Sequence, residues 1–206
     1  GDKFIPLNFD VSDLPATKTA LQTLPNDVLN NLDVLVNNAG LALGLESADK
    51  TDFADWQQMV NTNILGLIHL THEILPLMVA NNDGYIINLS STAGNYPYFG
   101  GNVYGATKAF VTQFSLNLRA DLVGKNIRVS NIEPGLCGGT EFSNIRFHGD
   151  DAKAAQVYDS VQYVTPQDIA NMVAWLIEQP KHVNINRIEV MPTAQTFAGL
   201  KVVKDL

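Results

Sequence analysis

The chain has 206 residues, 46% of them apolar, a length that suits one domain with a sizeable core. Its net charge is −8 and its basic residues are scattered, so we expect neither nucleic acid nor an anionic membrane as a partner. No apolar run reaches the roughly 18 residues of a membrane span, and the single cysteine excludes an intrachain disulfide and favours a reducing, cytoplasmic setting.

Short β-rich runs alternate with longer helical patterns, which predicts parallel strands joined by crossover helices. We expect an α/β fold with a doubly wound, Rossmann-like parallel sheet, in one domain that covers residues 1–206. The expected strands lie at residues 4–9, 32–36, 85–89, 127–132 and 187–190.

Three helices stand out between these strands. Residues 52–78 place apolar side chains at three- and four-residue spacings, which indicates one buried stripe. Asp52 is expected to cap this helix, and Pro76 to bend or end its last turns because proline lacks a backbone donor. A second helix covers residues 103–122, and a third opens with Thr165 as its cap and Pro166 in its first position.

Tyr104 and Lys108 stand four residues apart on the second helix. Four residues make roughly one turn, so both side chains share a face and the ammonium can lie beside the phenol oxygen. A tyrosine pKa is normally about 10, and a nearby positive charge lowers it. The pair indicates proton transfer to or from an alcohol or carbonyl, although a packed tyrosine and an exposed lysine would explain either residue alone.

Polar residues follow two of the expected strands. Ser91 comes just after the strand at 85–89, where ligands bind in open α/β sheets. Asn37, Ala39 and Gly40 belong to an Asn-Asn-Ala-Gly run after the preceding strand, and a glycine there lets the backbone approach a ligand closely. Ordinary turn chemistry is the alternative for each feature taken singly.

Together these features resemble the short-chain dehydrogenase/reductase family over nearly all of the chain. Residues 38–44, 101–110 and 132–136 look most like bacterial NADP-dependent 3-hydroxy acid dehydrogenases, which oxidise serine and related short β-hydroxy acids or run the reverse reduction. In chain order, the motifs that carry the family resemblance are Asn37-Asn38-Ala39-Gly40, Asn63, Ser91, Tyr104, Lys108 and Pro134-Gly135.

The resemblance implies a role for each member of a catalytic group. Tyr104 would be the general base in oxidation and the general acid in reduction, and Lys108 would lower the phenol pKa and hold the nicotinamide ribose. Ser91 lies thirteen residues before Tyr104 and is preferred to Ser90 as the hydrogen-bond donor to the substrate oxygen. Asn63 would help to hold a water that links the lysine to solvent.

The implied cofactor is NADP, with NAD not excluded. Asp10 and Val11 resemble the pair that contacts the adenine ring, and Thr140 resembles a phosphate-binding threonine. The full set of expected cofactor-binding residues is Asp10, Val11, Asn37, Ala39, Gly40, Tyr104, Lys108, Pro134, Gly135 and Thr140.

Family members open with a first β-α-β unit that carries a glycine-rich phosphate-binding turn, and this unit is absent from the sequence shown. We therefore expect residues upstream of Gly1 in the parent enzyme. A chain starting at Gly1 is expected to bind dinucleotide weakly and to expose a strand edge.

Substrate specificity is expected to come from loops over the site. Tyr98 lies in the loop between Ser91 and Tyr104, and residues 141–163 correspond to a mobile lid. Arg146 is the single arginine of that lid, and its guanidinium suits a substrate carboxylate. The alternative for Arg146 is a surface pair with a lid carboxylate.

The sequence thus predicts an NADP-dependent oxidoreductase of short 3-hydroxy acids that forms a homotetramer, as family members often do. One alternative is the same chemistry on another small alcohol, ketone, sugar or acyl thioester. Another is a catalytically silent, truncated binding or scaffold protein. We expect no metal, because His69, His72 and Glu73 do not match a His-Glu-x-x-His zinc site.

Overall fold

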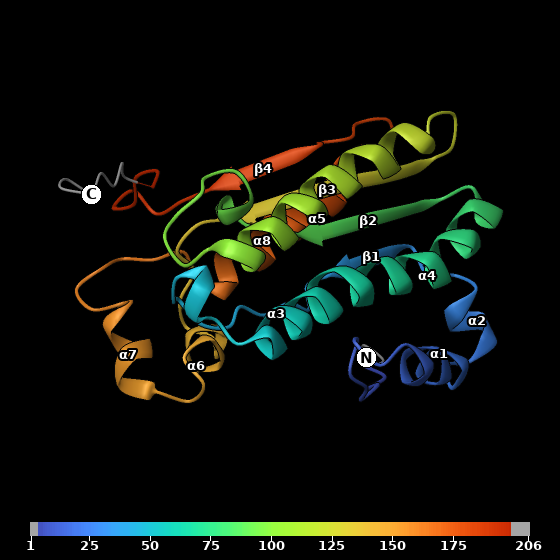
Figure 1. Cartoon of the computed structure of the whole chain (residues 1–206). Helices are drawn as coiled ribbons and strands as arrows, with labels where there is room; N and C mark the ends of the chain where they lie inside the picture. Colours follow the sequence, from blue (N-terminus) through green and yellow to red (C-terminus); the bar gives the residue numbers. More distant parts are fainter. Residues whose placement is uncertain (1–3, 199–206) are drawn as a thin grey trace.

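The computed structural model describes residues 4–198, and its centre is a four-stranded sheet in the order β1-β2-β3-β4 (Figure 1). All neighbouring strands are parallel. This confirms the predicted doubly wound α/β class. The strands are β1 Val34–Asn37, β2 Gly84–Leu89, β3 Ile127–Pro134 and β4 Arg187–Val190.

Helices cover both faces of this sheet, with α4 and α5 on one side and α8 on the other (Figure 1). A π-helical segment, Asn61–Gly66, joins α3 to α4, and short 3₁₀ turns cover Ala48–Lys50 and Thr92–Gly94. The helices are α1 Leu14–Gln22, α2 Asn26–Leu29, α3 Phe53–Val60, α4 Leu67–Asn81, α5 Asn102–Asp121, α6 Phe142–Arg146, α7 Asp151–Gln156 and α8 Pro166–Glu178.

Strand β2 divides the core into two layers. All of its residues are buried, and successive side chains point to opposite faces. Ile86 packs with Met78 of α4, whereas Ile87 packs with Leu176 of α8. Burying an aliphatic side chain of this size contributes roughly 1.5–3 kcal/mol, so β2 anchors both helical layers and fixes where its carboxyl end lies.

The predicted strand at residues 4–9 is wrong. In the described part of the chain this segment has no strand conformation, and Phe4 is 87% exposed. A strand is stabilised by hydrogen bonds to a neighbour. The described sheet has β1 at its edge and no strand beside residues 4–9.

The two predicted helix caps, Asp52 and Thr165, are present in the structure. The Asp52 carboxylate accepts a hydrogen bond from the backbone N–H of Ala54, as expected of a cap. At α8, Thr165 and Asp168 form a reciprocal capping box, with Pro166 in the first turn. These two caps set the directions in which the helices leave the sheet.

Pro76 was expected to bend or end its helix, and it does not end it, because α4 continues to Asn81. Pro76 lies on the exposed side, so the carbonyl left without its N–H partner can bond to water. Ile74 and Met78 are buried on either side of Pro76, and their packing holds the helix together.

The continuous helix Phe53–Asn81 is long and apolar enough, by length and composition alone, to cross a membrane. This differs from the sequence expectation. Only 33% of an 18-residue apolar stretch of this helix is buried in the fold. Its buried side chains pack on β1 and β2, as those of a core helix do. We therefore interpret it as a sheet-packing helix with one apolar face still exposed.

Candidate active site

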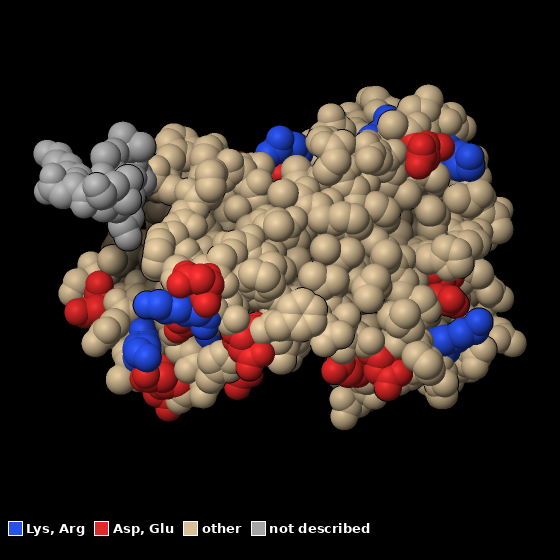
Figure 2. All heavy atoms as spheres, in the orientation of Figure 1, with Lys and Arg blue, Asp and Glu red and all other residues tan. Residues whose placement is uncertain are grey.

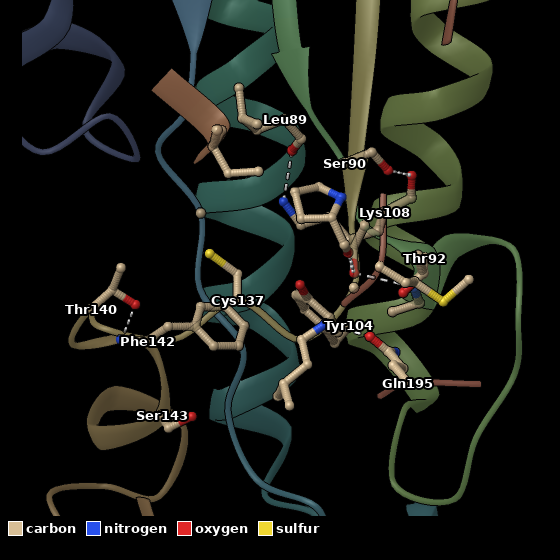
Figure 3. A pocket seen from close by; sticks show the side chains of 18 of the residues that line it. Leu89, Ser90, Thr92, Tyr104, Lys108, Cys137, Thr140, Phe142, Ser143 and Gln195 are labelled. Carbon is tan, nitrogen blue, oxygen red and sulfur yellow. Dashed lines mark hydrogen bonds between the residues drawn. The ribbon is translucent and has the colours of Figure 1, made fainter. Parts of the chain in front are cut away.

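A cavity of about 950 Å³ opens at the carboxyl ends of the parallel strands (Figure 3). This is where ligands bind in open α/β sheets. Its walls come from the strand ends, the start of α5, helix α6 and the segment after β4. Of the sequence-predicted residues, those that line it are Gly40, Ser91, Tyr98, Tyr104, Lys108, Pro134, Gly135, Thr140 and Arg146.

Helix α5 brings Tyr104 and Lys108 to one buried wall of the cavity. The Lys108 Nζ lies 5.9 Å from the centroid of the Tyr104 ring. It also donates a hydrogen bond of 2.9 Å to the carbonyl oxygen of Leu89, at the end of β2 (Figure 3). The ammonium is thus fixed between the strand end and the tyrosine, and the predicted one-turn pairing is present.

Burial decides the protonation of both groups. It raises the pKa of Tyr104 to about 12, against the opposing effects of a hydrogen bond with Ser91 and the charge of Arg146. It lowers the pKa of Lys108 to about 8. The expected lowering of the phenol pKa is therefore wrong for the chain alone, because desolvation of the phenolate outweighs the nearby charges.

Ser90 and Ser91 point to different partners. The Ser90 hydroxyl donates to the backbone oxygen of Lys108 at 2.6 Å and so supports α5. The Ser91 hydroxyl caps the following 3₁₀ turn by accepting from the Ala93 N–H at 3.1 Å, donates to the Pro134 oxygen at 3.2 Å, and lies near enough to Tyr104 to lower its pKa. The choice of Ser91 over Ser90 as the residue facing the reacting group agrees with this geometry.

Asn63 lies in the π-helical segment and is buried. Its Oδ1 accepts from the Leu41 N–H at 2.9 Å, and its Nδ2 donates to the Leu41 oxygen at 2.8 Å and to Thr107 Oγ1 at 3.0 Å. Both amide hydrogens are used, and the Oδ1 accepts one hydrogen bond, so the expected contact of this amide with a water stays a prediction. The contacts of Asn63 hold the loop of Gly40 and Leu41 against α5.

Gly40 must be small for this arrangement. A Cβ at Gly40 would lie 3.2 Å from Lys108 Nζ and 3.3 Å from Asn63 Oδ1. The glycine therefore leaves the ammonium accessible from the cavity.

Four expected cofactor residues do not line the cavity: Asp10, Val11, Asn37 and Ala39. Asp10 accepts hydrogen bonds from the backbone and hydroxyl of Ser12, which lower its pKa. The Asn37 amide donates to Asn88 and Thr71 on the α4 side of the sheet. Side chains alternate along a strand, so the neighbours of Asn37, which are Val36 and Asn38, line the cavity instead.

The turn after β3 contributes Pro134 and Gly135 to the cavity, and Thr140 follows at the entrance to α6. Thr140 Oγ1 accepts from the Phe142 N–H at 3.3 Å (Figure 3). Its hydroxyl proton remains available to a ligand.

Sequence reasoning missed the segment after β4. Met191, Gln195 and Phe197 line the cavity, and Gln195 Oε1 accepts from the Leu136 N–H at 2.7 Å (Figure 3). No motif marks this segment. Its position just beyond the carboxyl end of a parallel strand was the available signal.

Arg146 and Tyr98 meet at the wall of the cavity. The Arg146 Nη2 donates to the Tyr98 hydroxyl at 2.8 Å, and its Nε donates to the Gly44 oxygen at 3.1 Å. The guanidinium carbon lies 5.6 Å from the ring centroid of Tyr104. Within residues 4–198, Arg146 forms no ion pair, so the alternative of a surface pair does not hold there.

Two other chemical features offer no site. Burial raises the pKa of the half-buried Cys137, so its thiol stays protonated near neutral pH. His69 pairs with Glu73 at 3.6 Å on α4, and among the described residues no group of three His, Cys, Asp or Glu could hold a metal ion.

Comparisons with known proteins agree with this geometry. A family model described as short chain dehydrogenase matches residues 1–150. A probable NADP-dependent dehydrogenase of Haemophilus influenzae is 68% identical over 205 residues, which are 100% of this chain and 81% of that protein. The NADP-dependent 3-hydroxy acid dehydrogenase YdfG of Escherichia coli K12 is 54% identical over 98% of this chain and 81% of its own length.

A solved structure is also similar. The closed form of serine dehydrogenase complexed with NADP⁺ superimposes with a TM-score of 0.92 at 55% identity. The match covers 95% of this chain and 79% of that one.

Proposed function

This chain belongs to the short-chain dehydrogenase family, and we propose that it is an NADP-dependent dehydrogenase of short 3-hydroxy acids such as serine. The observation that carries the substrate assignment is that Tyr104 and Arg146 line the same cavity side by side. There an acid–base tyrosine, Tyr104, lies beside the guanidinium of Arg146, a group suited to a carboxylate. Relatives described as 3-hydroxy acid and serine dehydrogenases support the same substrate class.

The cavity residues fit a nicotinamide dinucleotide. An ammonium has three donors, and Lys108 uses one of them on Leu89, so two remain for ribose hydroxyls. Gly40 leaves room beside this ammonium, and Gly135 and Thr140 border the same space. When bound, the cofactor accepts or supplies the hydride. NADP is favoured by the relatives.

In the oxidation, the substrate hydroxyl would lie between Ser91 and Tyr104. Ser91 would donate a hydrogen bond to the oxygen, and the hydroxyl proton would pass to the ionised Tyr104 phenolate as the carbonyl forms, so the oxidation needs the deprotonated tyrosine and is favoured by high pH. In the reduction Tyr104 returns that proton. Because burial raises the pKa of Tyr104, the phenol is protonated and ready to act as the acid near neutral pH.

The direct test is turnover with serine and other 3-hydroxy acids, followed as NADPH absorbance, beside matched alcohols that lack the carboxylate. NADP and NAD should be compared at equal concentration. Efficient turnover of neutral alcohols or acyl thioesters, with none of the acids, would contradict the substrate assignment but leave the family chemistry in place. Absence of any redox turnover would favour a silent binding protein.

Arg146→Ala should raise KM for 3-hydroxy acids by about ten- to a hundredfold, because a hydrogen bond to a charged group contributes roughly 1.5–3 kcal/mol. KM for neutral alcohols should change much less. Arg119→Ala, at the far end of α5 and outside the cavity, is the matched control. An equal loss with charged and neutral substrates would show that Arg146 does not bind the carboxylate.

We further propose a homotetramer with a cytoplasmic location. The exposed apolar face of the Phe53–Asn81 helix supports association, and Figure 2 shows few charged side chains over the middle of α4 and α5. Exposed apolar area of this kind is typical of protein interfaces. Light scattering on the purified protein should give the mass of four chains. The single cysteine is in keeping with a reducing compartment.

A further inference from the structure

A buried charge lies next to the site but takes no part in the chemistry described above. Glu133 is on β3, immediately before Pro134, and is 0% exposed. A carboxylate in such a place is costly unless every oxygen is paired. Its Oε1 accepts from Asn131 at 2.6 Å, from Arg187 at 2.8 Å and from Thr112 at 3.4 Å.

The other carboxylate oxygen connects the sheet to a loop. Glu133 Oε2 accepts from Arg187 Nη2 at 2.7 Å and from Asn95 Nδ2 at 2.7 Å. Asn95 follows Ser91 in the chain, whereas Arg187 is on β4. Arg187 Nη2 also donates to Asn95 Oδ1 at 3.1 Å. The guanidinium and the carboxylate therefore hold the two ends of one amide.

A second carboxylate completes the attachment. Glu189 on β4 accepts from Asn95 Nδ2 at 3.0 Å and from the Tyr96 hydroxyl at 3.1 Å. Tyr96 and Tyr98 both line the cavity, and Tyr98 accepts the hydrogen bond from Arg146. The position of the cavity wall formed by Tyr96 and Tyr98 thus depends on hydrogen bonds from Asn95 and Tyr96 to the sheet.

These bonds do more than join two strands. Strands β3 and β4 are already held in register by their backbone ladder, from Asn131–Arg187 to Pro134–Val190. The contacts of Asn95 add nothing to that pairing, and their effect is to fix the loop. Charge-assisted hydrogen bonds are about twice as strong as neutral ones, which suits them to this task.

We propose that Glu133, Arg187 and Asn95 are positioning residues that fix the loop carrying Tyr96 and Tyr98 and so set how tightly the site holds its substrate. The part of this inference that concerns substrate rests on the proposed function. The part that concerns the loop does not.

Asn95→Ala is the sharpest test, because it frees the loop and leaves the Glu133–Arg187 ion pair intact. We expect faster hydrogen–deuterium exchange in residues 94–101, because the loop loses the three bonds of the Asn95 side chain to Glu133, Glu189 and Arg187. KM for 3-hydroxy acids should rise about tenfold, roughly what a substrate loses with one hydrogen bond to a charged group. Affinity for NADP should stay unchanged. Asn31→Ala is the matched control, because it removes an exposed hydrogen bond of 2.6 Å that the Asn31 side-chain amide donates to the Asp27 oxygen in the α2 region.

Arg187→Lys keeps the charge opposite Glu133 but loses the planar fork, so it should give an intermediate change in both measurements. Unchanged exchange in Asn95→Ala would overturn the proposal. Faster exchange with unchanged KM in an active enzyme would overturn its substrate part. If the wild-type protein does not turn over 3-hydroxy acids, the proposed function fails, and the exchange measurement alone decides whether the loop is fixed in this way.

Discussion

Tyr104→Phe should lower kcat by at least about two orders of magnitude, since a general acid–base group contributes roughly 10²–10⁴-fold. The change removes one oxygen from a ring that stays buried among Ala42, Met59 and Phe142. We therefore expect the folded structure and its affinity for cofactor to remain close to wild type. Stopped-flow and steady-state rates, with circular dichroism as the check on folding, make the measurement.

Tyr85→Phe provides the matched control. Tyr85 is also a buried phenol with a raised pKa, and its hydroxyl bonds to Ser130 at 2.6 Å in the core behind the site. Loss of that hydroxyl should cost stability and spare turnover. Near-normal turnover in Tyr104→Phe would contradict the mechanism. A comparable loss of kcat in Tyr85→Phe would mean that both changes act through the fold.

The sequence predicts that Ser91, Tyr104 and Lys108 meet at one cavity because their positions follow local rules. A four-residue spacing places Tyr104 and Lys108 on one helix face whatever the rest of the fold does. Ser91 follows a buried strand, and parallel strands in one sheet point their carboxyl ends the same way. These rules bring residues from separate elements to one edge of the sheet.

Properties that depend on burial, such as a side-chain pKa or the direction in which a side chain points, could not be predicted from local rules. The expected phenol pKa had the wrong direction, because the sequence shows that a cation is near but not how dry the site is. Asn37 was expected to face the cofactor, yet β1 lies between helical layers and shows no polar alternation that would reveal which side chain faces which layer.

Contacts between distant residues were also missed. Glu133 bonds to Arg187 across 54 residues, and Asn95 bonds to Glu189 across 94. Nothing in the local pattern of either pair predicts its partner. Gln195 was missed for the same reason, since only the fold places it against Leu136.

Lys108→Met should reduce turnover and move the ascending limb of the pH–rate profile for oxidation to higher pH. With a pKa of about 8, Lys108 is charged at neutral pH. Below about pH 8, where Lys108 carries its charge, a positive charge 5.9 Å from the Tyr104 ring centroid favours phenolate, so its removal should lower the phenolate fraction in that range. Initial rates between pH 6 and 10 test this, and an unmoved limb would refute the electrostatic role.

The same variant should be more stable than wild type below about pH 8. Lowering a lysine pKa from 10.5 to about 8 corresponds to roughly 3 kcal/mol of disfavoured charge, whereas the lost bond to Leu89 costs only about 1 kcal/mol. Between pH 8 and 10.5 the unfolded wild-type chain binds more protons than the folded one, so wild-type stability rises with pH there.

The gap between the melting temperatures of Lys108→Met and wild type should therefore be a few degrees at pH 7 and shrink toward pH 10.5. Calorimetry across this range measures it. Lys50→Met is the control, because Lys50 is exposed and its replacement should leave the gap near zero at every pH. A Lys108→Met variant that is both inactive and less stable would show that the ammonium is retained for packing. A variant that is inactive and more stable would show that the buried charge costs stability and is kept for its chemistry.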